Sequence, residues 1–451
     1  MKLGSSKELA RATEPGSAGC LRVPSCWEGR TGPARAKPPE LARATESDSA
    51  GCLRVPGCWE GRAGPARARP PVLGAMATIA LGLLNTGLAA GQAAPAKQLM
   101  SEQAFKNVTV LKGIPVDEFM ATMGFIAAST NYNCTDCHVE PKVEGDWSVF
   151  AEETPRKEKA RRMILMVEAI NKSNFGGARA VTCYTCHRNV QGAPKITPSL
   201  ADQYGEPPPV DPNEVEITRQ APGAPSADQI FDKYLQAVGG AQKATAITSI
   251  LFKGMYQGYA EPKAPVDIYV KAPNQRTMIV HTDAGDRTTT CDGSNGWIAA
   301  PAMDKPFPVI RFTGGELDAA RLDAVLSFPA GIKQALTKPL VGSSSIDEKD
   351  VAVVQGTANG GRSPVKLYFD KQSGLLVRQV RYSDTIIGRV PIQVDYSDYR
   401  DVAGAGVKLP FHVITTWTDG KSDVLLTSAE TNVAIDAAKF NQPLPSAPPK
   451  Q

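Results

Sequence analysis

Two short stretches of the chain carry residues that could do chemistry, and both have the same pattern. Residues 134–138 read Cys-Thr-Asp-Cys-His and residues 183–187 read Cys-Tyr-Thr-Cys-His, so each is a C-x-x-C-H motif. Two thiols three residues apart can reach the two vinyl groups of one haem, and the adjacent imidazole then lies under the iron. Paired Cys/His zinc sites, whose thiolates use similar spacings, are the alternative. The motifs predict two covalently bound c-type haems, held by Cys134, Cys137 and His138 and by Cys183, Cys186 and His187.

Each iron would need a second axial ligand, and methionine is the natural candidate. The chain has four histidines, two of which belong to the motifs, while His281 and His412 lie far along the chain in strand-like patterns. His/Met ligation suits electron transfer and raises the reduction potential. Within one helix and loop ahead of each motif stands a pair of methionines three residues apart, namely Met120 and Met123, and Met163 and Met166. The residues alone leave two candidates for each site.

Both methionine pairs lie in segments with helical periodicity. Apolar residues recur at helical spacing over 116–126 and again over 163–170. Thr154 and Pro155 have the residue types of an N-cap and a first-turn proline, and the glycines at 176–177 end the second segment. Each segment therefore predicts a helix whose apolar face can lie over a haem.

The region from 105 to 204 resembles the tetrahaem cytochrome subunit of photosynthetic reaction centres, and more closely the exported two-haem relatives of that family. The resemblance is carried by the helix at 118–123, the runs 133–138 and 182–188 around the motifs, and the stretch 161–171, which begins Arg-Arg-Met. In that family each repeat is a helix, a loop and a C-x-x-C-H helix. The resemblance implies a small α-helical domain that carries single electrons between redox partners, including membrane-bound ones, and does not act as an enzyme.

The resemblance also selects axial ligands. The family's ligand position matches Met123 for the first haem and Met163 for the second, with Met120 and Met166 as alternates that would otherwise pack. Three features depart from the family. The chain has two haem motifs in place of four, Asn189 stands where a glycine often follows the motif, and the family's His-ligated haem has no counterpart. A reaction-centre donor, or a two-haem peroxidase or sensor with one five-coordinate iron, remains a rival interpretation.

The first hundred residues do not read as a folded domain. Residues 8–39 recur as residues 40–71 with 27 of 32 positions identical, which predicts a disordered, duplicated leader over 1–75. The basic end of this leader, the apolar run at 72–84 and the alanine-rich stretch up to 96 have the order of a secretory signal peptide, which we assign to 76–96. We therefore expect export to the periplasm or to the outer face of the inner membrane.

Composition and charge exclude several classes of protein. The chain has 451 residues, of which 42% are hydrophobic and 21% are charged, so a mostly disordered or polytopic membrane protein is excluded. The net charge of +4 comes from the leader, where residues 1–75 carry 12 Lys or Arg and seven Asp or Glu. The remainder is nearly neutral, which argues against nucleic acid as a partner. Five of the nine cysteines lie outside the motifs, four in the leader and Cys291 alone, so a disulfide scaffold is not expected.

The second half predicts an antiparallel β domain. Residues 205–225 are proline-rich and predict a linker. Over 226–446 a short helix, a helical insert at about 315–336 and several hairpins, with turns at 371–374 and 419–420, predict a curved sheet around one or two helices. The fold class is therefore multidomain α plus β, with a two-haem cytochrome c domain over 97–204.

The pattern of the β domain is similar to the half-barrel of periplasmic lipoprotein carriers. That similarity implies an apolar ligand on the concave face, and a closed core that only packs or docks is the alternative. A lipid or lipoprotein carrier-like binding protein with accessory haems is therefore a further rival function. His281 and His412 are interpreted as surface or packed histidines, and Cys291 as a small buried hydrophobe.

Overall fold

The computed structural model describes residues 98–143, 146–194, 196–198, 205, 211–220, 222–258, 262–301 and 307–445. All of them belong to one compact unit, Ala90–Gln451. The predicted leader and signal peptide lie outside the described residues. Among the helices that are described, none has the length and apolar character needed to cross a membrane.

The first part, residues 98–194, is helical and is called the helical segment below. Thr154 caps α4 by accepting a hydrogen bond from the Lys157 N–H at 3.2 Å, and Pro155 opens the helix as predicted. The chain then leaves α4 through two glycines with positive φ, at 176 and 177. The elements of the helical segment are α1 (Ser101–Ala104), α2 (Val116–Thr130), α3 (Cys134–Cys137), η1 (Trp147–Ala151), α4 (Pro155–Asn174) and α5 (Cys183–His187).

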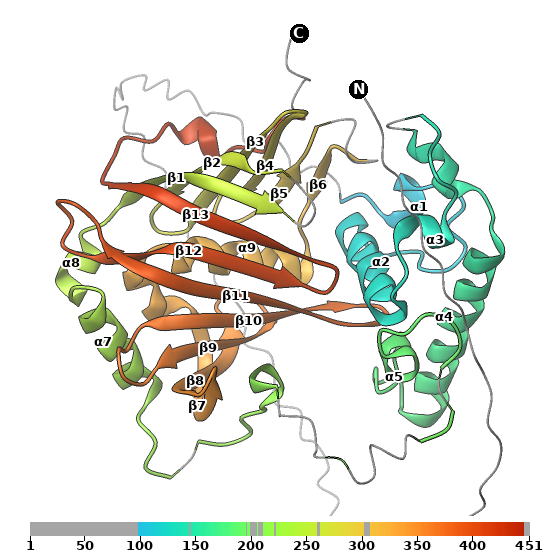
Figure 1. Cartoon of the computed structure of the whole chain (residues 1–451), viewed down its shortest axis with the longest axis horizontal. Helices are drawn as coiled ribbons and strands as arrows, with labels where there is room; N and C mark the ends of the chain where they lie inside the picture. The colour runs from blue at the N-terminus through green and yellow to red at the C-terminus, as the bar shows by residue number, and fades with distance from the viewer. Residues whose placement is uncertain are drawn as a thin grey trace, which may run out of the picture. The chain divides into compact units, whose positions relative to one another are not determined.

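The second part is built on one sheet of 13 antiparallel strands, in the order β6-β5-β4-β3-β2-β1-β13-β12-β11-β10-β9-β8-β7 (Figure 1). Apart from one crossing, between β1 and β13, neighbours in the sheet are neighbours in the sequence, so the sheet is a meander of hairpins. The strands are β1 (Ser249–Gly258), β2 (Ala264–Lys271), β3 (Gln275–Thr282), β4 (Gly285–Cys291), β5 (Gly296–Ala299), β6 (Val309–Arg311), β7 (Leu336–Ile346), β8 (Lys349–Ala358), β9 (Pro364–Asp370), β10 (Leu376–Thr385), β11 (Gly388–Asp401), β12 (Lys408–Trp417) and β13 (Gly420–Thr431).

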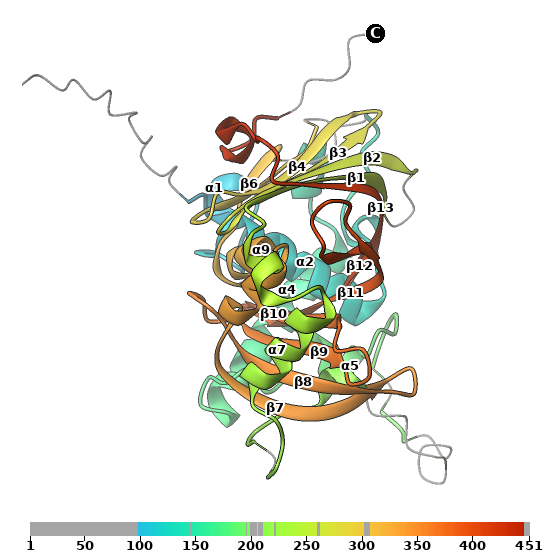
Figure 2. The same cartoon turned by 90° about the vertical axis from the view of Figure 1, so that its left-hand side faces the viewer.

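The sheet curls around helices, as Figure 2 shows. The helices are α7 (Ala227–Ala237), α8 (Ala241–Thr245), α9 (Gly314–Leu326) and the 3-10 turn η3 (Pro329–Gln334), and a last 3-10 turn, η4 (Ala437–Phe440), follows β13. Phe231 and Leu235 of α7 and Leu322 of α9 are buried in one apolar cluster with side chains of β7, β8 and β9. A second cluster lies on β1, β2, β3, β12 and β13. The predicted α plus β fold with a curved antiparallel sheet is confirmed.

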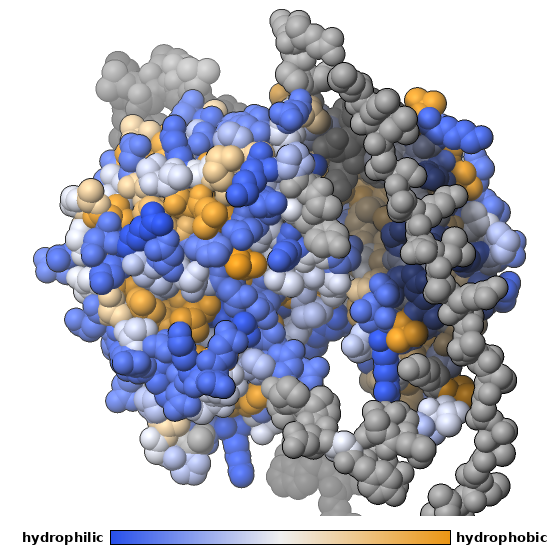
Figure 3. All heavy atoms as spheres, viewed as in Figure 1, coloured by the Kyte–Doolittle hydropathy of each residue, from blue (hydrophilic) through white to orange (hydrophobic). Residues whose placement is uncertain are grey.

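Part of the predicted linker packs on the sheet. The short turn η2 (Pro212–Glu214) lies against β9 and β10, where the buried Lys366 ammonium donates to the carbonyls of Asn213 and Val215 at 2.8 and 2.7 Å. The Tyr368 hydroxyl donates to the Pro212 carbonyl at 3.0 Å. The face of the sheet region in Figure 3 is otherwise largely hydrophilic with scattered apolar side chains, as on ordinary protein surfaces.

Candidate haem sites

The first motif forms one helical turn whose N-terminus is capped. The Asn133 side chain accepts the Asp136 N–H at 2.9 Å while the Asp136 carboxylate accepts the Asn133 N–H at 2.9 Å, which makes a capping box in front of α3. Residues three apart on a helix lie on the same face, so the turn presents the Cys134 and Cys137 side chains to one side. Cys134 is exposed and Cys137 is half-buried, and burial raises the pKa of the Cys137 thiol.

His138 is held in the state that an iron ligand needs. Its Nδ1 lies 2.9 Å from the Phe150 carbonyl oxygen, and because a carbonyl can only accept, Nδ1 carries the hydrogen. The imidazole also stacks on the Phe150 ring, with centroids 4.8 Å apart and planes 20° from parallel. Burial lowers the pKa of His138, which keeps the ring neutral. Nε2 is therefore left with a free lone pair, the arrangement that metal-binding histidines adopt.

The loop before α4 fixes this geometry. Trp147 packs edge-on against Phe150, with centroids 5.3 Å apart. The Lys157 ammonium donates to the Phe150 carbonyl at 2.9 Å, and the Thr154 hydroxyl donates to the Cys137 carbonyl at 2.6 Å. The role of Phe150 cannot be found from the sequence, because no local pattern marks a carbonyl 12 residues away as the partner of a histidine.

The second motif is built in the same way. The Thr182 and Thr185 side chains form a capping box in front of α5. Cys183 is half-buried and Cys186 is exposed, and burial raises the pKa of the Cys183 thiol. Asn189, which departs from the glycine of the family, has φ +59°, a left-handed conformation that asparagine tolerates better than most residues. The substitution therefore keeps the turn that follows the motif.

The two motif histidines differ in whether their Nδ1 atom has a hydrogen-bond partner. The Nδ1 of His187 is buried and has no hydrogen-bond partner within the described part of the chain. A buried polar nitrogen without a partner is costly, and coordination of the ring at Nε2 would orient it by another means. The residues of both motifs thus fit an iron porphyrin. The first site is the better ordered, because the Nδ1 of His138 has a hydrogen-bond partner and that of His187 has none within the described residues.

Asn171 joins the end of α4 to the second motif. Its side chain donates to the Val181 carbonyl at 2.7 Å and accepts the Val181 N–H at 2.9 Å, and only 7% of the residue is exposed. The stretch that carries the resemblance thus places an amide where it fixes the approach to Cys183.

The two repeats interlock. The helix α5 of the second motif lies against α2, and the Asn189 N–H donates to the Ser129 carbonyl at 2.9 Å. The helix α3 of the first motif lies against α4, through the contact between Thr154 and Cys137. The helix α5 therefore packs mainly on α2 and also touches α4, while α3 packs on α4.

The predicted methionines lie on both long helices. Met123 and Met163 are half-buried, whereas Met120 is 38% exposed and Met166 is 43% exposed. Met123 packs against the same apolar cluster as Cys183. No distance in the structure decides between the two methionines of a pair, so Met123 and Met163 stay predictions.

Apolar side chains of α4, its C-cap and the second motif remain open to solvent. A porphyrin presents a broad apolar plane, and its burial against such side chains would remove them from water. These side chains are Leu165, Met166, Phe175, Tyr184 and Val190, each more than 40% exposed. These exposed apolar side chains, like the two motifs, therefore suit the binding of haem.

The other candidate residues lie on the sheet. His281 on β3 pairs with Asp286 at 2.8 Å, and His412 on β12 pairs with Asp423 at 3.0 Å. Cys291 is 2% exposed at the end of β4. Within the described ranges, no group of three or more His, Cys, Asp and Glu side chains is arranged to hold a metal ion.

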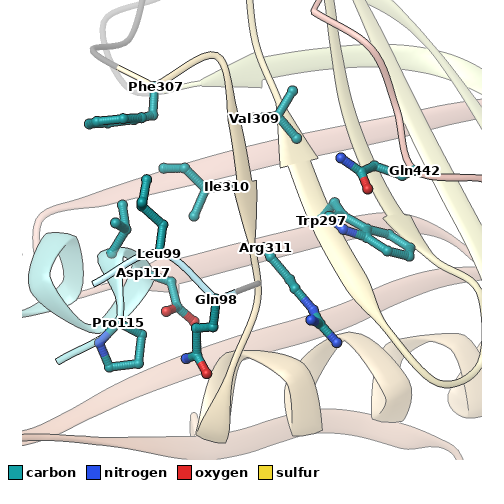
Figure 4. Close-up of a pocket in the computed structure, with 11 residues that line it drawn as sticks. Gln98, Leu99, Pro115, Asp117, Trp297, Phe307, Val309, Ile310, Arg311 and Gln442 are labelled. Atoms are coloured by element: carbon teal, nitrogen blue, oxygen red, sulfur yellow. The ribbon is translucent and has the colours of Figure 1, made fainter. Parts of the chain in front are cut away.

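Two cavities border the sheet. One, of about 150 Å³, lies between the start of α2 and strands β5 and β6 and is lined by Asp117, Trp297 and Arg311 among others (Figure 4). The other, of about 310 Å³, lies beside α9 and has Arg321 and Asn274 in its lining. Ligand pockets usually range from about 300 to 1,000 Å³, so the first is small and the second is at the lower limit. The α7 and α9 side chains fill the concave face between them.

Comparison with known proteins relates one part of the chain to a cytochrome family. Residues 84–203 match the family model of the photosynthetic reaction centre cytochrome c subunit. The cytochrome c subunit of the reaction centre of Thermochromatium tepidum is 35% identical over 92 residues, which are 20% of this chain and 21% of that protein. The chain thus spans about a fifth of the length of this relative.

The chain is also similar to solved structures, at low identity and low TM-score. A LolA superfamily protein from Nitrosomonas europaea is 15% identical, with a TM-score of 0.35 over 48% of this chain and 98% of its own. A DUF1329 family protein from Desulfovibrio piger is 12% identical, with a TM-score of 0.34 over the same shares. The segment with both C-x-x-C-H motifs, in contrast, lies wholly within the part of the chain that is similar to the reaction centre cytochrome c subunit.

Proposed function

We propose that the protein is an exported two-haem c-type cytochrome that carries single electrons between redox proteins. The observation that carries the proposal is the pair of capped C-x-x-C-H turns, with the His138 ring fixed in one tautomer by the hydrogen bond from Nδ1 to the Phe150 carbonyl. The match of residues 84–203 to a cytochrome c subunit supports it. The sheet region would dock the partners or a membrane-associated component.

Each haem would be held by residues of one repeat. Cys134 and Cys137 would form the thioether bonds of the first haem, with His138 and Met123 as axial ligands. For the second haem the corresponding residues are Cys183, Cys186, His187 and Met163. The iron supplies reversible one-electron chemistry.

The protein's own residues set the conditions for that chemistry. A histidine and a methionine from the chain would leave the iron no open position for a substrate, as expected of a carrier and not of a peroxidase. The Phe150 carbonyl keeps the His138 ring in one tautomer and orientation, so little has to move when the charge of the site changes. Apolar side chains of α2 and α4 would exclude water.

The mass of the mature exported protein tests the proposal directly. We expect a polypeptide that begins near residues 90–96 and carries the added mass of two haems. We also expect a low-spin absorption spectrum with a sulfur-to-iron band in the oxidised form. A colourless protein with the mass of the bare polypeptide would overturn the proposal, and binding of carbon monoxide under native conditions would favour the peroxidase or sensor.

A further inference from the structure

One hairpin tip in the sheet has the wrong residues for a turn. Four described hairpins have two-residue turns, and three of these turns contain an aspartate, at 283, 347 and 419. The fourth, between β10 and β11, consists of Ile386 and Ile387. Tight turns favour Gly, Asn and Asp, and they normally lie in water. An isoleucine pair at such a place indicates that the tip is built to contact something apolar.

The tip contacts the helical segment. Ile387 is 2% exposed and is buried in one apolar cluster with Phe125 of α2 and Ile164 of α4. The same cluster borders Met123 and Cys183. The apolar partner of the tip is therefore the region in which the haem ligands lie.

The approach is too close for any residue but glycine after the tip. A Cβ on Gly388 would lie 2.3 Å from Cζ of Phe125, well inside van der Waals contact. The Thr385 side chain closes the turn by donating to the Gly388 carbonyl at 2.8 Å and accepting the Gly388 N–H at 3.1 Å. The turn is thus shaped for this contact.

Polar contacts also hold the residues on either side of Ile387 at the same tip. The Arg179 guanidinium, which lies just before the second motif, donates to the Thr385 carbonyl and pairs with Asp384 at 3.2 Å. The Glu118 carboxylate of α2 accepts the backbone N–H of Ile386. The tip between β10 and β11 is therefore attached to α2 through Glu118 and to the loop before α5 through Arg179.

We propose that the Ile386–Ile387 tip is a positioning element of the haem site, an inference that rests on the proposed function. The tip fixes α2 so that its methionine meets the iron, and it keeps water from that side of the haem. Water near a haem stabilises the more highly charged oxidised form, so exclusion of water raises the reduction potential. The sheet region thus tunes the potential in addition to any docking.

The test compares two isoleucine truncations in the mature full-length protein. Ile387→Ala shortens the tip, and Ile268→Ala is the matched control, because Ile268 is 5% exposed in the cluster on β1 and β2, away from α2. We measure the two haem potentials by equilibrium redox titration, the sulfur-to-iron band, and hydrogen exchange of the α2 amides. Gly388→Ala, which pushes Phe125 without removing apolar contact, is the second variant.

In Ile387→Ala and Gly388→Ala we expect faster exchange of α2 amides and a weaker sulfur-to-iron band. At a fixed ambient potential the ratio of reduced to oxidised iron should fall about tenfold for the haem ligated from α2, which is 59 mV for one electron. Ile268→Ala should leave the potentials and the band unchanged. Equal effects in Ile268→Ala, or attached haems whose potentials do not move in Ile387→Ala, would overturn this inference alone. Absence of haem from the wild-type protein would overturn the proposed function and this inference with it.

Discussion

The helical segment and the sheet region keep their shape by different means. Of the described residues 98–194, only six apolar residues are buried, whereas the sheet region has one cluster of 17 buried residues and another of 15. All of the predicted haem-binding residues lie in the segment with the smaller core. A region of this kind needs an added source of burial, which a haem and the Ile387 tip would both supply. The predicted haem ligands and the two largest apolar clusters are thus located in separate parts of the chain, joined at the Ile387 tip.

The largest expected effect comes from removing the thioether cysteines. In the double variant Cys183→Ala, Cys186→Ala we expect the loss of one haem and, with it, much of the helical structure of residues 98–194. The physical reason is that the apolar side chains around α5 lose the group that would cover them. Mass spectrometry counts the haems, and hydrogen exchange follows the helices.

Cys291→Ala is the matched control for the cysteine variant. Cys291 is buried on β4 and lies outside both motifs, so its truncation should leave two haems in place. If the double motif variant retained both haems and native exchange, the comparison between the two regions would fail.

A core truncation in the sheet should give the converse result. Phe369 is 2% exposed and touches Phe231 and Tyr234 of α7, with ring centroids 5.8 Å away in both cases. Phe369→Ala should lower the free energy of unfolding by about 3–5 kcal/mol, as large aromatic truncations in cores do. Urea denaturation measures the loss. A shift of either haem potential in the folded variant would contradict the separation of the two regions.

A third comparison sharpens the assignment within α4. Met163→Ala should lower the potential of the second haem by about 0.1 V, a modest part of the span of about 0.8 V that axial ligands set. Met166, on the same helix and 43% exposed, supplies the control variant Met166→Ala, which should leave that potential unchanged. Redox titration reads both. The reverse pattern would make Met166 the ligand.

The sequence predicted the local features of the site and missed its distant contacts. The C-x-x-C-H spacing, the Thr154 cap and the two methionine-bearing helices follow from neighbouring residues, because helix caps and periodicity are local. The Phe150 carbonyl at His138 and the tip at Phe125 depend on how separate elements pack. No spacing rule encodes such contacts.

The strands and turns of the sheet likewise divide into those that local sequence predicts and those that it does not. The hairpin turn at 371–374 was predicted and is present, since its polar residues and glycine mark it. Strands β4, β6, β7 and β8 were not predicted separately: β6 has three residues, and the LTKPLVGSSSI of β7 lacks regular alternation. The Ile386–Ile387 turn resembles continuous strand, so its position was visible only in the structure.

The smallest expected effect concerns a carboxylate that joins the two regions. Asp117 of α2 is 8% exposed and accepts hydrogen bonds from the Thr313 N–H at 2.5 Å and the Thr313 hydroxyl at 2.8 Å, at the start of α9. Burial raises the pKa of Asp117, although the Thr313 contacts oppose this, and Glu316 adds to the rise. Folding therefore favours the protonated form. Its contribution to stability is fully present below the ordinary aspartate pKa of about 4 and is lost as the pH rises through the raised pKa.

Asp117→Asn keeps an acceptor for Thr313 but cannot ionise, so it removes this pH dependence. Between about pH 4 and neutral pH, the variant should gain unfolding free energy relative to the wild type, because the raised pKa of Asp117 makes its ionisation costly in the folded state alone. Asp370→Asn is the control of opposite sign. Hydrogen bonds from Ser373 lower the pKa of Asp370, so the advantage of the wild type over that variant should disappear as the pH falls below about 4. Denaturation at a series of pH values measures both differences, and a flat difference for Asp117→Asn above pH 4 would show that α2 and α9 are not joined through a buried carboxylate.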